Sequence, residues 1–222
     1  LTVHLPDYLN ALAGGALDRK AERRMGLPWS ERLVYRSRLA VQGTLNAALM
    51  ALHDGIAANL AGGTHHAMPY HAEGFCVLND VAVACMALKR SRWIRRALIV
   101  DLDVHQGNGT AEIFANDPDI YTFSMHGANN YPFRKPPSDR DIALPDDTGD
   151  ELYLSHLDDH LDTVIDAARP DLIFYLAGVD TVAGDRFGRL ALSRAGLHQR
   201  ERFFLSTCHR EGIPVTLLMS GG

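Results

Sequence analysis

Short apolar runs alternate with longer amphipathic stretches along this chain, and this alternation constrains the fold more than any other feature. Four apolar runs and a weaker fifth end in polar residues or glycine, at residues 97–101, 120–125, 171–176, 214–219 and 55–60. Between them lie stretches with apolar residues at helical spacing, at residues 30–52, 80–90, 148–168 and 194–211. Near-continuous apolar runs are typical of strands buried on both faces of a parallel sheet. The pattern therefore predicts an open α/β fold with a mostly parallel sheet.

Residues at the ends of the helical stretches support their expected boundaries. Asn79 and Ser193 are suited to cap helices that begin at the next residue, and Pro170 is expected to end the third helix. Residues 127–147 are rich in Pro, Asn, Asp and Arg and are predicted to form one long loop. A loop of that length in a compact domain is usually functional or disordered.

The composition fits one globular domain and argues against several other classes of protein. Of 222 residues, 46% are apolar and 22% are charged, so we expect a single domain over residues 1–222. No apolar run reaches the roughly 20 residues that a membrane helix needs. The net charge of −5 offers no basic field for direct nucleic-acid binding. The three cysteines lack CxxC spacing, which argues against a disulfide framework and favours a cytoplasmic location.

An acidic motif with a histidine gives the strongest chemical signal. Asp101, Asp103 and His105 alternate at the end of the run at residues 97–101. In an extended chain, residues two apart share a face, so these three side chains are expected to project together. The alternative interpretation of this motif is a capped turn with a solvated acidic face that binds no ion. Carboxylates crowded at the carboxyl end of a parallel strand favour a cation site.

Two further motifs add donors of the same kind. His65 and His66 follow a pair of glycines that permits a tight backbone beside a ligand, although two unrelated loop histidines would give the same pattern. Asp180 follows the run at residues 171–176 and is expected at the same sheet edge. Asp103, His105 and Asp180 then form a three-ligand set without sulfur, which leaves a coordination position open, as in catalytic sites. Zn²⁺ fits such a set, and Fe²⁺ or Co²⁺ fit nearly as well.

These motifs, taken in order, resemble the histone deacetylase family. The resemblance is carried by residues 62–66, 74–80, 100–110, 177–180, 184–185 and 220–222. Residues 3–9 and 184–190 look most like class IV members. The resemblance implies an arginase-like fold with three α/β/α layers and the hydrolysis of acyl groups from lysine or a related amine. The implied substrates are acylated lysine in proteins or an acylated small amine.

The resemblance also implies roles for individual residues. Asp103, His105 and Asp180 would hold the catalytic metal, with zinc as the expected ion. His65 and His66 would flank the reacting water, one as a general base and the other as a general acid or electrostatic partner. The remaining implied roles are orientation of His65 (Asp101), a position behind His66 (Asn108), a narrow substrate tunnel (Gly74, Phe75 and Tyr131) and a structural potassium site (Asp101, Asp103, His105, Ser124 and Met125).

Two of these implied roles leave open questions. Class I members carry Asp at the place of Asn108, so the imidazole of His66 is expected to be harder to protonate here. The rings of Phe75 and Tyr131 also fit ordinary packing.

The ends of the chain bear on its expected activity. Leu1 and the terminal Ser220-Gly221-Gly222 turn suggest a fragment cut at both ends. Family members carry a tyrosine after this turn, so we expect Tyr immediately after Gly222 in the parent protein. A fragment without this hydroxyl donor is expected to be slower by about 10²- to 10³-fold.

Two alternatives to a deacetylase remain at this stage. An arginase-like enzyme with two metals needs further carboxylates, but Gly107 and Val182 stand where they would lie. A silent module that binds acyl-lysine without cleaving it would keep the same pocket. Metal content and turnover distinguish these alternatives.

Overall fold

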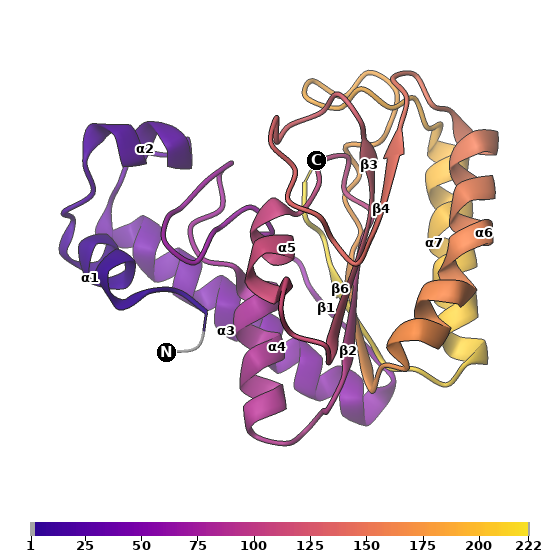
Figure 1. Ribbon diagram of the computed structural model, residues 1–222, viewed down its shortest axis with the longest axis horizontal. Coiled ribbons are helices and arrows are strands. Elements are labelled where there is room, and N and C mark those ends of the chain that lie inside the picture. The colour runs from indigo at the N-terminus through magenta and orange to yellow at the C-terminus, as the bar shows by residue number, and fades with distance from the viewer. Residues whose placement is uncertain (1–2, 222) are drawn as a thin grey trace.

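A parallel sheet forms the centre of the computed structural model, which describes residues 3–221 (Figure 1). Gly222, which precedes the expected tyrosine, lies outside the described residues, as do Leu1 and Thr2. Within the described part, the sheet has six parallel strands in the order β1-β6-β5-β2-β3-β4. The strands are β1 (Ile56–Asn59), β2 (Ala97–Asp101), β3 (Ile120–Gly127), β4 (Arg140–Leu144), β5 (Leu172–Leu176) and β6 (Val215–Leu218).

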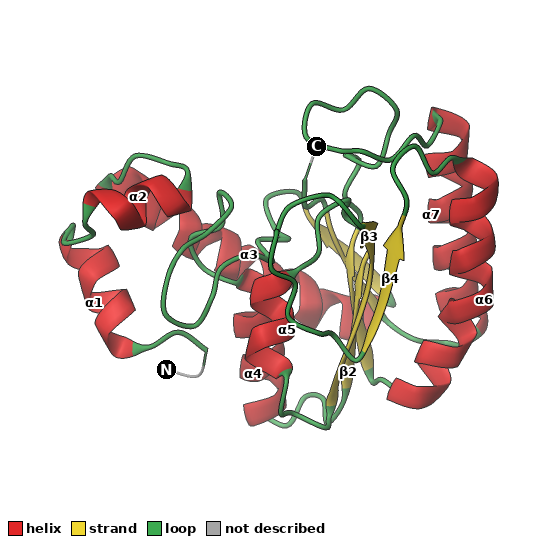
Figure 2. Ribbon diagram, turned by 45° about the horizontal axis from the view of Figure 1, so that its top comes forward, coloured by secondary structure: helices red, strands yellow, loops and turns green. Residues whose placement is uncertain are grey.

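Helices cover both faces of the sheet and complete three layers (Figure 2). The helices of the described residues are α1 (Pro6–Gly14), α2 (Arg19–Met25), α3 (Glu31–Asp54), α4 (Asp80–Arg90), α5 (Asn108–Phe114), α6 (Asp150–Ala168) and α7 (Arg194–Arg210). α6 and α7 lie on one face, and α3, α4 and α5 lie on the other. This arrangement confirms the expected α/β fold and is consistent with an arginase-like architecture. No helix among residues 3–221 is long and apolar enough to cross a membrane.

Alternate residues of the central strands enter separate hydrophobic cores. Leu98 belongs to the core that Leu161 of α6 lines, whereas Ile99 belongs to the core that Cys85 of α4 lines. Every residue of β2 and β5 is buried, as expected for strands covered on both faces. The apolar runs of the sequence therefore had to be continuous, because both faces of these strands need apolar side chains.

The N-terminal helices pack beside the sheet rather than on it (Figure 1). Tyr8, Leu12 and Met25 form a separate small core with Val77. The hydroxyl of Tyr8 donates to the carbonyl of Val77 at 2.5 Å. α1 and α2 thus support the loop at residues 72–77 that precedes α4.

Most expected elements are confirmed, and the differences have physical reasons. β2 and α4 have the expected bounds, and Asn79 and Ser193 accept hydrogen bonds at the starts of α4 and α7. The single loop expected at residues 127–147 is wrong, because β4 pairs with β3 there. β4 is an edge strand that begins with the polar residues Arg140 and Asp141, so it lacks the continuous apolar signal. The short helices α1, α2 and α5 were not predicted from the sequence.

Candidate metal centre and active site

β2 and β5 are neighbouring parallel strands, and the loops after them carry the candidate metal ligands. Asp101 at the end of β2 pairs in register with Leu176 at the end of β5. The N–H of Leu102 donates to the carbonyl of Leu176 at 3.1 Å. The segments that follow β2 and β5 therefore stay side by side beyond the last residue pair of the two strands. Open α/β sheets bind ligands at this edge, outside the carboxyl ends of the strands.

The chain bends directly after β2 instead of continuing as a strand. The N–H of Asp103 donates to Oδ1 of Asp101 at 3.2 Å, and the N–H of His105 donates to Oδ1 of Asp103 at 2.9 Å. The expectation that extended-chain alternation aligns these three side chains is therefore wrong, because β2 ends at Asp101. Aspartate side chains that satisfy the backbone of the turn bring the carboxylates and the imidazole together instead.

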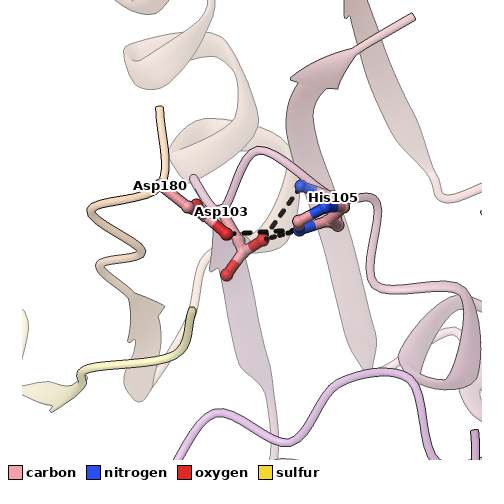
Figure 3. A group of neighbouring side chains, drawn as sticks. All are labelled: Asp103, His105 and Asp180. Carbon is pink, nitrogen blue, oxygen red and sulfur yellow. Dashed lines mark hydrogen bonds and ion pairs between the residues drawn. The ribbon is translucent and has the colours of Figure 1, made fainter. Parts of the chain in front are cut away.

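Asp103, His105 and Asp180 converge on one point (Figure 3). The Nδ1 atom of His105 lies 3.1 Å from Oδ1 of Asp103 and 3.2 Å from Oδ2 of Asp180. Asp103 and Asp180 are buried, and His105 is half-buried. Among residues 3–221, this is the one group of three or more His, Cys, Asp or Glu side chains close enough to share a metal ion.

Two carboxylates and a ring nitrogen this close together require a positive charge. Although burial disfavours the charged ring, hydrogen bonds to Asp103 and Asp180 raise the pKa of His105 to about 10. The Nδ1 atom carries at most one proton but faces two carboxylate oxygens. That proton can form a good hydrogen bond to only one of them. Zinc ligands at about 2.0–2.1 Å from a tetrahedral ion lie about 3.3 Å apart, close to the separations found here. The three side chains therefore fit a divalent ion.

The segment after β6 also contacts this group. Ser220 Oγ and the N–H of Gly221 both donate to Oδ2 of Asp103 at 2.8 Å. A Cβ atom at position 221 would lie 2.4 Å from Oδ2 of Asp180, so only glycine fits there. Three strand ends thus meet at the candidate metal centre.

A buried aspartate holds the turn that carries the histidine pair. Asp80 accepts hydrogen bonds from the N–H groups of Gly63 at 3.0 Å and Thr64 at 2.7 Å. Gly63 has a φ of +100°, and a Cβ there would lie 2.7 Å from Cα of Ser220. Asp80 was not selected as a site residue from the sequence, although it closes the motif at residues 74–80. Its complete burial was the missing information.

The two histidines have different partners. Nδ1 of His65 lies 2.6 Å from Oδ2 of Asp101, and Nδ1 of His66 lies 2.7 Å from Oδ1 of Asn108. Burial disfavours a charged His65, but the carboxylates of Asp101 and Asp103 raise its pKa to about 9. Burial, followed by the neighbouring His65, lowers the pKa of His66 well below its usual value. The ring centroids lie 4.1 Å apart, so the pKa values of two adjacent imidazoles are shifted in opposite directions.

The expected tunnel residues lie on two separate loops. The Tyr131 ring stands edge-on to His66, with centroids 5.0 Å apart. Gly74 has a φ of +55°, and a Cβ there would lie 2.7 Å from the His66 ring. Phe75 is 60% exposed, and its ring lies against Gly26. Tyr131 and Gly74 therefore border His66, whereas Phe75 faces the end of α2.

Two of the residues implied for potassium lie on β3. Ser124 pairs in register with Asp101 of β2, and its hydroxyl lies 2.9 Å from Nδ1 of His126. Met125 is fully buried. Ser124 thus lies beside the strand end that carries the site, and potassium binding stays a prediction.

A carboxylate that sequence analysis did not select connects several of these residues. Glu73 accepts hydrogen bonds from Asn108 Nδ2 at 3.0 Å and from the Tyr131 hydroxyl, and it lies 2.8 Å from Nε2 of His71. No spacing rule relates these four positions, because they come from three separate segments.

Comparisons with known proteins agree with this arrangement. The histone deacetylase domain model matches residues 1–222. An uncharacterised protein of Picosynechococcus sp. is 51% identical over 99% of this chain and 73% of its own length. Histone deacetylase 2 of Arabidopsis thaliana is 32% identical over 100% of this chain, and a probable deacetylase of Archaeoglobus fulgidus is 31% identical over 100% of it. This chain spans 60% and 65% of those two relatives. Assignment to class IV stays a prediction, but the chain belongs to the histone deacetylase family.

Proposed function

We propose that this chain forms the catalytic region of a zinc-dependent hydrolase that removes acyl groups from lysine or a related amine. The observation that carries the proposal is a group of two carboxylates and an imidazole beside two histidines of opposite charge preference. Family membership supports deacetylation as the reaction class. The acylated amine is the substrate, either on a protein or as a small molecule.

Asp103, His105 and Asp180 would hold the divalent ion. When bound, the ion supplies Lewis acidity, which polarises the acyl carbonyl and makes water easier to deprotonate. The carboxylates of Asp103 and Asp180 balance the charge of the ion.

The histidine pair supplies the proton transfers. His66 is neutral because its pKa is lowered, so its free ring nitrogen can accept a proton from the attacking water. Asp101 lies 2.6 Å from Nδ1 of His65 and favours the protonated ring, which can stabilise negative charge that develops on the acyl oxygen. The proton held by His66 then passes to the leaving amine nitrogen when the amide bond breaks.

Metal content and turnover of matched variants test the proposal. The protein is loaded separately with Zn²⁺, Fe²⁺ or Co²⁺, and hydrolysis of acetyl-lysine peptides and acetylated polyamines is measured with and without chelator. Asp180→Asn and His105→Ala are expected to lose both metal and activity. Asp158→Asn, on the exposed side of α6, makes the same chemical change and is expected to retain both.

The outcomes separate the proposed hydrolase from its alternatives. Metal bound with no turnover by the parent protein would favour a silent module that binds acyl-lysine. Full activity of Asp180→Asn would refute the ligand assignment. A stoichiometry of two ions would favour an arginase-like site, although residues 3–221 contain a single group of suitable ligands.

A further inference from the structure

Glu73 lies behind the histidine pair, at the junction of three segments. Its carboxylate is largely buried, with 18% of the side chain exposed. Oε1 accepts hydrogen bonds from Asn108 Nδ2 at 3.0 Å and from the Tyr131 hydroxyl. Oε2 lies 2.8 Å from Nε2 of His71. The hydrogen bond from His71, together with those from Tyr131 and Asn108, lowers the pKa of Glu73 to about 2.

The ionised carboxylate fixes which way the amide of Asn108 points. A carboxylate can only accept hydrogen bonds, so the group of Asn108 that faces Glu73 must be its NH₂. The amide oxygen then faces Nδ1 of His66 at 2.7 Å. An oxygen in that place requires Nδ1 to carry the proton, which leaves Nε2 of His66 as the nitrogen with a free lone pair.

An aspartate at position 108 would not need to be oriented by Glu73, because both of its oxygens accept hydrogen bonds. An asparagine alone could present its NH₂ to His66 and favour the opposite tautomer. We propose that Glu73 is a positioning residue that selects the Nδ1-protonated tautomer of His66 through the amide of Asn108. This inference depends on the proposed function only for its effect on turnover.

The direct test is the tautomer of His66, measured by ¹⁵N NMR of histidine-labelled full chain. The signal of His66 among the 11 histidines is assigned by its loss in His66→Gln. Glu73→Met removes the acceptor at similar length, and the Nδ1-protonated form is expected to decrease. Glu73→Gln keeps an oxygen that can accept from Asn108 and is expected to retain this form. Glu112→Met, on the exposed side of α5, is the matched control.

Kinetics of a double-mutant cycle provide the second readout. Glu73→Met is expected to lower kcat about 10- to 100-fold with KM unchanged, as for other partners behind a site residue. Asn108→Asp alone places two carboxylates at the present 3.0 Å separation, so it is also expected to lower kcat. The double variant removes that repulsion and keeps an acceptor for His66, so it is expected to recover most of the activity.

Several results would overturn the assignment. An unchanged His66 tautomer in Glu73→Met is one, and additive losses in the cycle are another. If Glu73→Met does not fold, Glu73→Ala provides the same comparison, and an unchanged His66 tautomer in that variant would overturn the assignment. If the unsubstituted chain is inactive, the proposed hydrolase fails while the NMR comparison still tests the role of Glu73.

Discussion

Replacing Arg200 with methionine tests how the loops that carry the metal ligands are held. Arg200 lies on α7 and has no exposed surface. Its guanidinium donates to the carbonyl of Leu102 at 3.1 Å and to the carbonyl of Gly178 at 3.0 Å, and it forms an ion pair with Glu201 at 2.6 Å. Because Leu102 adjoins one ligand and Gly178 lies two residues before another, a single side chain connects both loops.

The size of the effect follows from the groups left without partners. Methionine approaches the length of arginine but donates no hydrogen bonds. Each buried carbonyl left unpaired costs about 1–3 kcal/mol, so two cost about 2–6 kcal/mol. The loss of the Glu201 pair adds little, because 30% of the Glu201 side chain is exposed. The middle of that range, about 4 kcal/mol, corresponds to a fall in Tm of about 8–16 °C for a domain of this length.

Thermal unfolding followed by circular dichroism measures this change. Arg202→Met is the matched control, because Arg202 is exposed on the same helix. Metal affinity is measured in parallel, and Arg200→Met is expected to weaken it since both ligand-bearing loops lose an anchor. A Tm for Arg200→Met equal to that of Arg202→Met would refute the reasoning.

Three other measurements test separate parts of the molecule. Zinc at a hundred times its Kd is expected to raise Tm by about 5–11 °C, because binding to the folded state alone contributes about 2.7 kcal/mol. Scanning fluorimetry measures this shift, and Asp180→Asn should abolish it. Gly109→Ala places a Cβ 2.3 Å from the carbonyl oxygen of Ala67, so the stability of the fold and kcat should both fall. Gly14→Ala is the control, because no atom lies within 4 Å of its added Cβ, and it should change stability by no more than about 1 kcal/mol. The pKa of Glu73 is lowered to about 2, chiefly by its hydrogen bond to His71, so its carboxylate stabilises the fold above pH 4.5 and this contribution is lost as the pH falls towards 2. Urea unfolding should therefore show a shallower loss of stability over that range in Glu73→Gln than in the unsubstituted chain.

The candidate ligands could be selected from the sequence because they follow apolar runs directly. Asp103, His105 and Asp180 lie within five residues of the ends of β2 and β5, and those strands are neighbours. Strand ends of a parallel sheet share one edge, so the sequence indicated proximity without any tertiary information. The local geometry was not accessible in this way, because the bend at residues 102–105 depends on hydrogen bonds from side chains to the backbone.

Glu73 and Arg200 were not selected from the sequence, for different reasons. The partners of Glu73 come from distant segments, so only the folded chain identifies them. Arg200 did leave a signal, because it stands at helical spacing from the buried Phe204 and Cys208 of α7. A charged residue on the apolar stripe of a helix is a candidate for a buried network. β4 left a weaker signal, since an edge strand can expose polar residues.

Backbone N–H groups hold both carboxylates of the candidate metal centre. Asp103 uses Oδ2 to accept from Ser220 and Gly221, and its Oδ1 faces His105. Asp180 uses Oδ1 to accept from the N–H of Val104 at 3.0 Å, and its Oδ2 faces His105. An asparagine at position 180 would need its single oxygen for the backbone contact, so its NH₂ would point towards the cation. At position 103 the NH₂ would face a backbone donor in either orientation, because Oδ1 of Asp103 also accepts from the N–H of His105. Asparagine is therefore a poor substitute here despite its shape, because the surrounding backbone N–H groups compete with a metal for its single oxygen.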